Sequence, residues 1–255
     1  MSKTEYGLQM YSLRDITEDN MYMALSETAK MGYKYIEFAG FFGYKAEQIK
    51  DWLDELGLIC TGTHTRLDAI KPEMIEQTIA YHKIIGCKNL IVPGADWSSS
   101  EKMNENIGQL NWAYEKLKNE EITLAYHNHS REFLIQNYGK IIEDELLRRT
   151  KIDLEVDIFW AYNAGIDVIE FLNTYKNRIH ILHVKDGIAT KAENRNIEHV
   201  FDGVEEFSLG LGKAPVREVC EWGKKNNATM IVESEGLNPT GLEEVKRCIE
   251  FLNTI

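Results

Sequence analysis

The sequence lacks the features that mark a membrane-spanning or secreted protein. No apolar run approaches the length needed to cross a bilayer, and residues 1–6 lack the basic region and apolar stretch of a secretory signal. The four cysteines form no C-x-x-C pair and are widely scattered, at positions 60, 87, 220 and 248, so we expect reduced thiols. These absences predict a cytoplasmic protein without a membrane partner.

Positive charge is also scarce. Lys and Arg total 29 against 41 Asp and Glu, which gives a net charge of −12 and disfavours contact with a phosphate backbone. We therefore expect a small neutral or metal-chelated substrate and no nucleic-acid partner. No low-complexity segment or Pro/Gly-rich linker divides the 255 residues, so we expect one domain over residues 1–255.

Short β-type runs alternate with amphipathic helical runs along the chain. The helical runs place apolar residues three or four positions apart, as in Ala46, Ile49 and Leu53, and Gly57 is a natural helix stop. The expected strands are Tyr6–Tyr11, Tyr35–Ala39, Leu58–Thr63, Leu90–Pro93, Ile122–His127, Ile152–Ile158, Ile179–Val184 and Thr229–Glu233. Eight such alternations predict a single (β/α)8 TIM barrel. The alternative, a doubly wound open sheet, usually has a glycine-rich first turn, whereas SLRDITEDN follows the first strand.

Polar side chains gather where the strands of such a barrel end. Alternate strand residues face opposite ways, so Leu154 and Val156 point outward while Glu155 and Asp157 point inward. The same alternation turns three further pairs inward, His127 and His129, His183 and Lys185, and Glu233 and Glu235. Buried carboxylates are costly without partners, so a converging His, Asp, His and Glu set predicts a divalent metal site. Mixed nitrogen and oxygen ligands suit Mn²⁺, Co²⁺, Zn²⁺ or Fe²⁺.

Seven motifs then point to a family. They are GLQMYSLR, GYKYIEFAG and GLICTGTH at the first three strands, YHNHSREF at the fifth, LEVDIFWAYNAGID at the sixth, ILHVKDG at the seventh and MIVESE at the eighth. In this order the chain resembles the xylose isomerase-like TIM barrels, a family of sugar phosphate isomerases and epimerases. The resemblance implies one catalytic divalent cation held by four side chains from strands five to eight, which here are His127, Asp157, His183 and Glu233.

The resemblance also implies a reaction, the isomerisation or epimerisation of a keto or aldo sugar through a metal-stabilised enediolate. Glu233 is then the expected base. Many sugar epimerases of the family carry a second glutamate on strand five, where this chain has His127, and this departure weakens the case for a symmetrical two-glutamate mechanism. The remaining candidates for a second proton carrier are His127, Glu132, Lys185 and a metal-bound water.

Other residues near the strand ends are candidate sugar contacts. We expect Lys185 to bind a sugar oxygen or the enediolate, with a rim salt bridge as the alternative. His64, Trp160, His129, Glu132 and Gln9 are further candidates for substrate binding. The alternatives for Glu132 are orienting a histidine or forming a structural salt bridge. The long connection from Asp186 to Lys213 is a candidate lid, and Gly210 and Gly212 within it are weaker candidates for binding a phosphate.

Three rival functions remain. The first is a lyase or epimerase of 3-keto-glycosides, which uses the same proton abstraction. The second is an abasic-site endonuclease, which needs a trinuclear zinc cluster and a basic DNA groove, and seven histidines with a net charge of −12 disfavour it. The third is a non-catalytic sugar-binding barrel. Family members are often dimers or tetramers, so a homo-oligomer is a further expectation from the resemblance.

Overall fold

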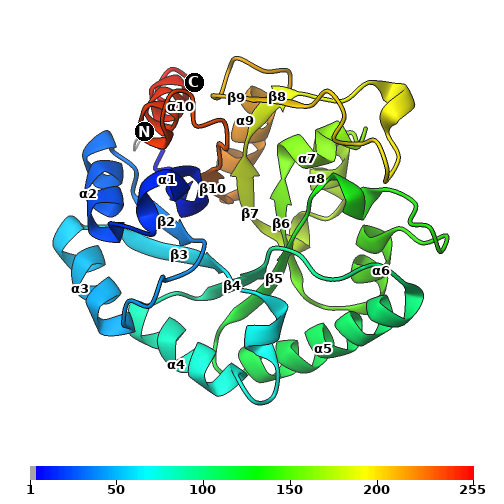
Figure 1. The fold of residues 1–255 in the computed structure, drawn as a ribbon, viewed down its shortest axis with the longest axis horizontal. Coiled ribbons are helices and arrows are strands. Elements are labelled where there is room, and N and C mark those ends of the chain that lie inside the picture. Colours follow the sequence, from blue (N-terminus) through cyan, green and yellow to red (C-terminus); the bar gives the residue numbers. More distant parts are fainter. Residues whose placement is uncertain (1–3) are drawn as a thin grey trace.

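A closed barrel of eight parallel strands forms the centre of the molecule, which a computed structural model describes over residues 4–255 (Figure 1). The strands are β1 (Gly7–Gln9), β2 (Tyr35–Phe38), β3 (Ile59–His64), β4 (Asn89–Val92), β5 (Thr123–His127), β6 (Asp153–Asp157), β7 (Ile179–Val184) and β10 (Thr229–Val232). Each pairs in parallel with its neighbour, and β1 closes the ring against β10. The predicted (β/α)8 barrel is thus confirmed, with all eight expected strands in place.

Helices surround the barrel on its outside (Figure 1). They are α1 (Arg14–Thr17), α2 (Met21–Met31), α3 (Ala46–Leu56), α4 (Ile75–Ile85), α5 (Ser100–Lys118), α6 (Ile142–Arg149), α7 (Ile158–Asn163), α8 (Val168–Thr174), α9 (Val216–Asn226) and α10 (Gly241–Leu252). Short 3₁₀ turns lie at Met10–Leu13, Leu67–Ile70, Ser130–Phe133, Lys176–Arg178 and Ala192–Asn194. No helix within residues 4–255 is both long and apolar enough to span a bilayer.

Local sequence signals set where these helices begin and end. The Ser99 hydroxyl accepts a hydrogen bond from the backbone N–H of Lys102, which caps the first turn of α5. Gly57 ends α3 in the left-handed conformation, which a glycine adopts without steric cost. The expected helix stop at Gly57 is therefore confirmed.

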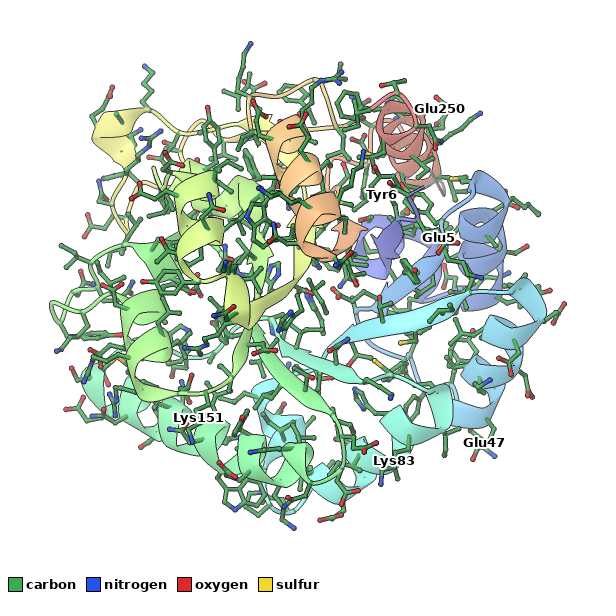
Figure 2. All side chains as sticks on the ribbon, turned by 180° about the vertical axis from the view of Figure 1, so that it is seen from behind. Glu5, Tyr6, Glu47, Lys83, Lys151 and Glu250 are labelled. Atoms are coloured by element: carbon green, nitrogen blue, oxygen red, sulfur yellow. The ribbon has the colours of Figure 1, made fainter. Side chains whose placement is uncertain are left out.

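The strand alternation separates an outer apolar layer from the barrel interior. The outward residues of β6 and β7, such as Leu154, Val156 and Leu182, are buried against the helices. The interior has a small apolar floor, whose buried members are Ile91, Ala125, Ile181 and Ile231. Seen from behind, side chains fill the middle of the barrel, while labelled charges such as Glu47 and Lys83 lie toward the rim (Figure 2). The polar site therefore lies above a closed apolar floor.

The connection after β7 contains structure that the sequence analysis did not predict. Two short strands, β8 (Asp186–Ile188) and β9 (Glu205–Phe207), pair antiparallel and hold the ends of this excursion together. Behind them the Asp186 carboxylate accepts hydrogen bonds from the backbone N–H groups of Gly187, Gly210, Gly212 and Ala214, at 2.8–3.0 Å. The N–H groups of Gly210 and Gly212, the weaker candidates for binding a phosphate, are thus already bound to a carboxylate of the chain.

Candidate metal centre

Four side chains from neighbouring strands converge inside the carboxyl end of the barrel. His127, Asp157, His183 and Glu233 each offer a ligand atom, and these atoms all lie within 4.8 Å of one another. They stand at the ends of β5, β6 and β7 and just after β10, and all four are buried. Two nitrogen and two oxygen donors in one dry position are a chemically suitable set for Mn²⁺, Fe²⁺, Co²⁺ or Zn²⁺.

Asp157 has one oxygen engaged by the protein and one left for a cation. Its Oδ1 accepts a hydrogen bond from the backbone N–H of Trp160 at 2.8 Å and so caps α7, whereas its buried Oδ2 has no partner within residues 4–255. Asn128 pairs with the backbone N–H and C=O of Asp157 and fixes this strand end. Burial raises the pKa of Asp157 to about 8, although Lys185 acts in the opposite direction. A buried carboxylate with a free oxygen fits a metal ligand.

The two histidines of this set differ in their surroundings. Burial, and then the neighbouring imidazoles of His183 and His64, hold the pKa of His127 well below its usual value, so its ring is neutral and suited to ligation. His127 Nδ1 lies 3.1 Å from Glu155 Oε2. His183 Nδ1 lies 3.3 Å from Glu233 Oε2, and its Nε2 lies 2.6 Å from Glu37 Oε1. Carboxylates on the far nitrogens orient both rings, as they do around metal-bound histidines.

Lys185 neutralises the acidic side of the site. Its ammonium contacts Glu235, lies 3.0 Å from Glu206 Oε2 and 3.9 Å from Glu233 Oε2, and stands over the Trp160 ring. Burial opposes its charge, but Glu233 and Glu235 outweigh burial and raise the pKa of Lys185 overall. Burial likewise opposes ionisation of Glu233, yet Lys185 and His183 hold the pKa of Glu233 well below its usual value. Lys185 is thus a buried cation that forms salt bridges, the alternative expected for it, with the partly exposed Glu206 and Glu235 among its partners.

A second polar group lies beside the first and shares two of its histidines. His64, His127, Glu155 and His183 also place ligand atoms within 4.8 Å of one another. The Glu37 carboxylate joins this group, because its Oε1 contacts His64 as well as His183. Glu37 and Glu155 were not chosen as site residues, although the inward phase of Glu155 was a usable signal. No local signal linked Glu37 to His183, which is 146 positions away in the chain.

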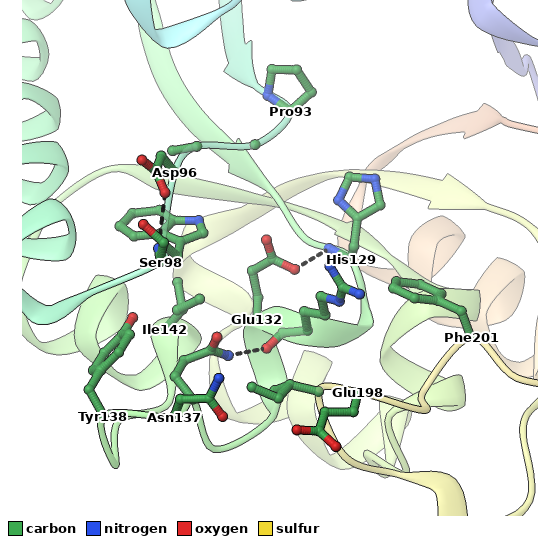
Figure 3. A pocket seen from close by; sticks show the side chains of 16 residues that line it. Pro93, Asp96, Ser98, His129, Glu132, Asn137, Tyr138, Ile142, Glu198 and Phe201 are labelled. Atoms are coloured by element: carbon green, nitrogen blue, oxygen red, sulfur yellow. Dashed lines mark hydrogen bonds between the residues drawn. The ribbon is translucent and has the colours of Figure 1, made fainter.

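A cavity of about 860 Å³ opens next to the imidazole side of this centre (Figure 3). His129 lines it and lies against the His127 ring, with ring centres 5.0 Å apart. Trp160 is buried between His129 and Phe201, at 6.1 and 5.5 Å between ring centres. Burial lowers the pKa of His129, which keeps this ring neutral. His129 therefore connects this cavity to the His127 side of the centre, and Trp160 packs against it.

Two predicted sugar contacts have other partners in the structure. Gln9 is fully buried, its amide donates to Glu37 Oε1 at 2.7 Å, and its oxygen accepts from the backbone of Tyr11, so it supports Glu37 and does not face a substrate. Glu132 accepts hydrogen bonds from the Tyr126 hydroxyl and from the His129 backbone (Figure 3). It orients the His129 turn, one of its two expected roles, through the backbone N–H and not through the imidazole ring.

The other histidines stand apart from the centre. His82 is buried between Thr63 and Thr78, while His180 and His199 are exposed beside an aspartate each. Within residues 4–255 the possible metal groups are the two that share His127 and His183. The part of the chain that the structure describes therefore offers no third group of the kind that a trinuclear zinc cluster requires.

Known proteins share this architecture. The family model of the xylose isomerase-like TIM barrel matches residues 25–255. The 2-oxo-tetronate isomerase of Haemophilus influenzae is 25% identical over 207 residues, which cover 70% of this chain and 80% of that protein. A sugar phosphate isomerase/epimerase from Parabacteroides distasonis has a TM-score of 0.78 at 23% identity, over 99% of this chain and 94% of that one. The probable 3-DHS dehydratase of Bacillus anthracis has a TM-score of 0.74 at 13% identity, over 98% of each chain. The chain belongs to the xylose isomerase-like TIM barrel family and is an enzyme.

Proposed function

We propose that the protein is a divalent-metal-dependent isomerase or epimerase of a keto or aldo sugar. The observation that carries the proposal is the convergence of His127, Asp157, His183 and Glu233 within 4.8 Å, with the free buried oxygen of Asp157 among them. The related 2-oxo-tetronate isomerase acts on a sugar-acid ketone, as its name states, which supports a small oxygenated substrate here.

His127, Asp157, His183 and Glu233 would hold the cation. A divalent ion bound there polarises a substrate carbonyl and acidifies the neighbouring C–H bond. Asp157 and Glu233 supply the negative charge that such an ion needs, and His127 supplies a neutral nitrogen. Burial opposes the charge of His183, but Glu155 and Glu37 outweigh it and raise the pKa of His183 well above its usual value, so a cation bound there would take the place of a His183 proton. Because His183 would bind the cation through Nδ1, its ring proton would stay on Nε2, where Glu37 accepts it.

Glu233 is the proposed base. Its carboxylate is ionised across the physiological range, because Lys185 and His183 outweigh the effect of burial on its pKa. It removes the acidified proton and leaves an enediolate, in which negative charge develops on the former carbonyl oxygen. Lys185 is permanently protonated and donates a hydrogen bond toward that oxygen. The base and the fixed cation thus lie on the same side of the site.

The opposite side binds the sugar. His129 is neutral, so each ring nitrogen is available as a donor or an acceptor for a hydroxyl. Trp160 gives an apolar wall next to it, and the cavity beyond has room for a group attached to the sugar. This room supports a second candidate function, a lyase of 3-keto-glycosides, in which the same enediolate expels a β-substituent.

Solvent exchange tests the proposal. In D₂O, wild-type protein loaded with Mn²⁺, Co²⁺ or Zn²⁺ is expected to place deuterium next to the carbonyl of one member of a panel of ketoses, aldoses and 3-keto-glycosides. Glu233→Gln is expected to slow this exchange by about 10²- to 10⁴-fold, whereas Glu250→Gln on the exposed face of α10 serves as the control (Figure 2). The product then separates isomerase, epimerase and lyase. Absence of exchange across the panel would overturn the enediolate mechanism.

A further inference from the structure

We propose that the barrel binds a second divalent cation, held by His64, Glu37, Glu155 and His183 next to the first. This position is distinct from the first, because Asp157 and Glu233 do not belong to it and His64, Glu37 and Glu155 do not belong to the first. His183 faces both positions, with Nδ1 toward Glu233 and Nε2 toward Glu37 and Glu155. One imidazole ring therefore separates the two cations.

The spacing of the four donor atoms fits one ion. His64 Nε2 lies 2.8 Å from Glu155 Oε2 and 3.2 Å from Glu37 Oε1. His183 Nε2 lies 2.6 Å from the same Glu37 oxygen and 3.2 Å from the same Glu155 oxygen. The edge of a tetrahedron around Zn²⁺ is roughly 3.3 Å for metal–ligand distances of about 2.0 Å. Two nitrogens and two oxygens thus alternate around a closed ring that needs only a small expansion.

Each of the two carboxylates also has a second buried oxygen, outside the ring of four donor atoms, that lacks a partner. These oxygens are Glu37 Oε2 and Glu155 Oε1, which have no hydrogen-bond partner within residues 4–255, and both side chains are fully buried. Unsatisfied buried carboxylate oxygens are costly and uncommon. In the same part of the chain, the ion-pair partners of these two carboxylates are histidines, with no Lys or Arg among them. The protein itself therefore supplies no permanent cation here.

The second cation would take the place of a proton on His183. With Nδ1 facing the first cation and Nε2 facing the second, His183 would bridge the two as an imidazolate, and the Nε2 proton that Glu37 accepts in the one-ion state would be released to solvent. This step rests on the cation of the proposed function.

The position also has a route for an ion and room for Glu37. His64 lines a cavity of about 640 Å³ between the loops after β2 and β3, and its side chain is 10% exposed. Gly62 lies next to Glu37, where a Cβ atom would stand 2.5 Å from Glu37 Oε2. Gln9 fixes the same carboxylate from the other side. Glu37 is thus held in place by the fold and reached through His64.

Metal stoichiometry in matched variants tests the proposal. Chelator-treated protein is reloaded with Zn²⁺ and, separately, with Co²⁺, and metal per chain is measured by plasma mass spectrometry, with Co²⁺ uptake followed by visible absorption. We expect about two ions per chain and two phases of Co²⁺ uptake. Glu155→Gln and His64→Asn are each expected to lower the affinity for the second ion by at least about 10- to 100-fold. Asp157→Asn is expected to lower the affinity for the first ion. Asp153→Asn, at the opposite end of β6, is the control with both ions.

Each other outcome has a definite meaning. One ion that survives Glu155→Gln and His64→Asn but is lost in Asp157→Asn overturns the second position and leaves the proposed function standing. One ion that survives Asp157→Asn but is lost in Glu155→Gln and His64→Asn confirms the position at His64 and overturns the metal site of the proposed function. Absence of bound metal in folded wild-type protein overturns both.

Discussion

The two sides of the barrel mouth hold their titratable groups in opposite ways. On the β7 and β10 side, Lys185 and Glu233 are both held in their charged forms. On the β5 side, His127 and His129 are both held neutral, mainly by burial. The difference shows that burial alone does not set ionisation, since all four are buried or nearly so. Opposite charges outweigh burial at Lys185 and Glu233, whereas the imidazoles of His183 and His64 add to the effect of burial at His127. A substrate between the sides meets an ionised base on one face and neutral hydrogen-bonding rings on the other.

The largest expected effect on the rate of solvent exchange comes from Asp157 on β6, the strand between the two sides. Asp157→Asn removes the buried carboxylate oxygen that has no protein partner, and with it a charged metal ligand. Metal ions stabilise developing charge by several kcal/mol, so the rate of solvent exchange is expected to fall by about 10³-fold or more. Asp153→Asn on the same strand controls for folding. Unchanged exchange in Asp157→Asn would mean that the two sides do not meet at a metal.

The charged side is tested by removing its cation. Lys185→Met leaves Glu233, Glu235 and Glu206 without their shared partner, which is expected to cost about 3 to 5 kcal/mol of unfolding free energy in urea titrations. Lys185 lowers the pKa of Glu233, so its loss raises that pKa and moves the acidic limb of the pH–rate profile to higher pH. Lys185→Arg keeps the charge and is the control. An acidic limb that does not move would separate Lys185 from the base.

Behind the β5 side lies a glutamate, Glu143, whose pKa is shifted in the opposite direction to that of Glu233. Glu143 in α6 is buried, and burial followed by nearby Glu132 raises its pKa to about 8 from 4.5. The folded state then keeps a proton that the unfolded state releases, so stability is lost as pH rises from about 4.5 to about 8. Glu143→Gln is expected to unfold with a free energy higher than wild type by up to about 5 kcal/mol at pH 9, with the two proteins converging at pH 4 to 5. A constant difference across pH would contradict the raised pKa.

The smallest effect is expected from the neutral rings. His129→Asn removes a hydrogen-bonding group that is already uncharged, so kcat/KM is expected to fall by about 10-fold, equivalent to one lost hydrogen bond. The pH–rate profile is expected to keep its acidic limb, because Glu233 remains. Kinetic assays at several pH values check both statements, with His199→Asn on the exposed excursion as the control. A fall of 10³-fold would instead make His129 a proton carrier and the two sides chemically equivalent.

Much of the fold and of the first metal group was predictable, because strand alternation is a local property. Because Leu154 and Val156 point outward, Asp157 must point inward wherever β6 lies in the barrel. The same reasoning holds for His183. Glu37 was not predictable as a partner of His183, because that contact depends on strand order and on the Gly62 opening. The contact between Gln9 and Glu37 was also not predictable, since a buried amide looks the same in sequence whether it meets a substrate or another part of the protein.

The excursion after β7 was the least predictable segment. Its two strands are three residues each and contain Gly187 and acidic residues, so they show no apolar period. The backbone N–H groups that bind Asp186 have no signature in the side-chain sequence either. The sequence therefore indicated a long loop and two glycines, but not that their N–H groups bind the carboxylate of Asp186.

The pairing of β8 with β9 has a consequence for how this enzyme tolerates change in length. Gly187 stands opposite Glu206 in the ladder, so the position of Glu206 beside Lys185 is set by that register and not by the residues between the two strands. The Asp186 carboxylate closes the base of the same excursion. Insertions and deletions between 191 and 199 therefore alter the wall of the cavity of about 860 Å³, which Ile197 and Glu198 line, while Glu206 keeps its place.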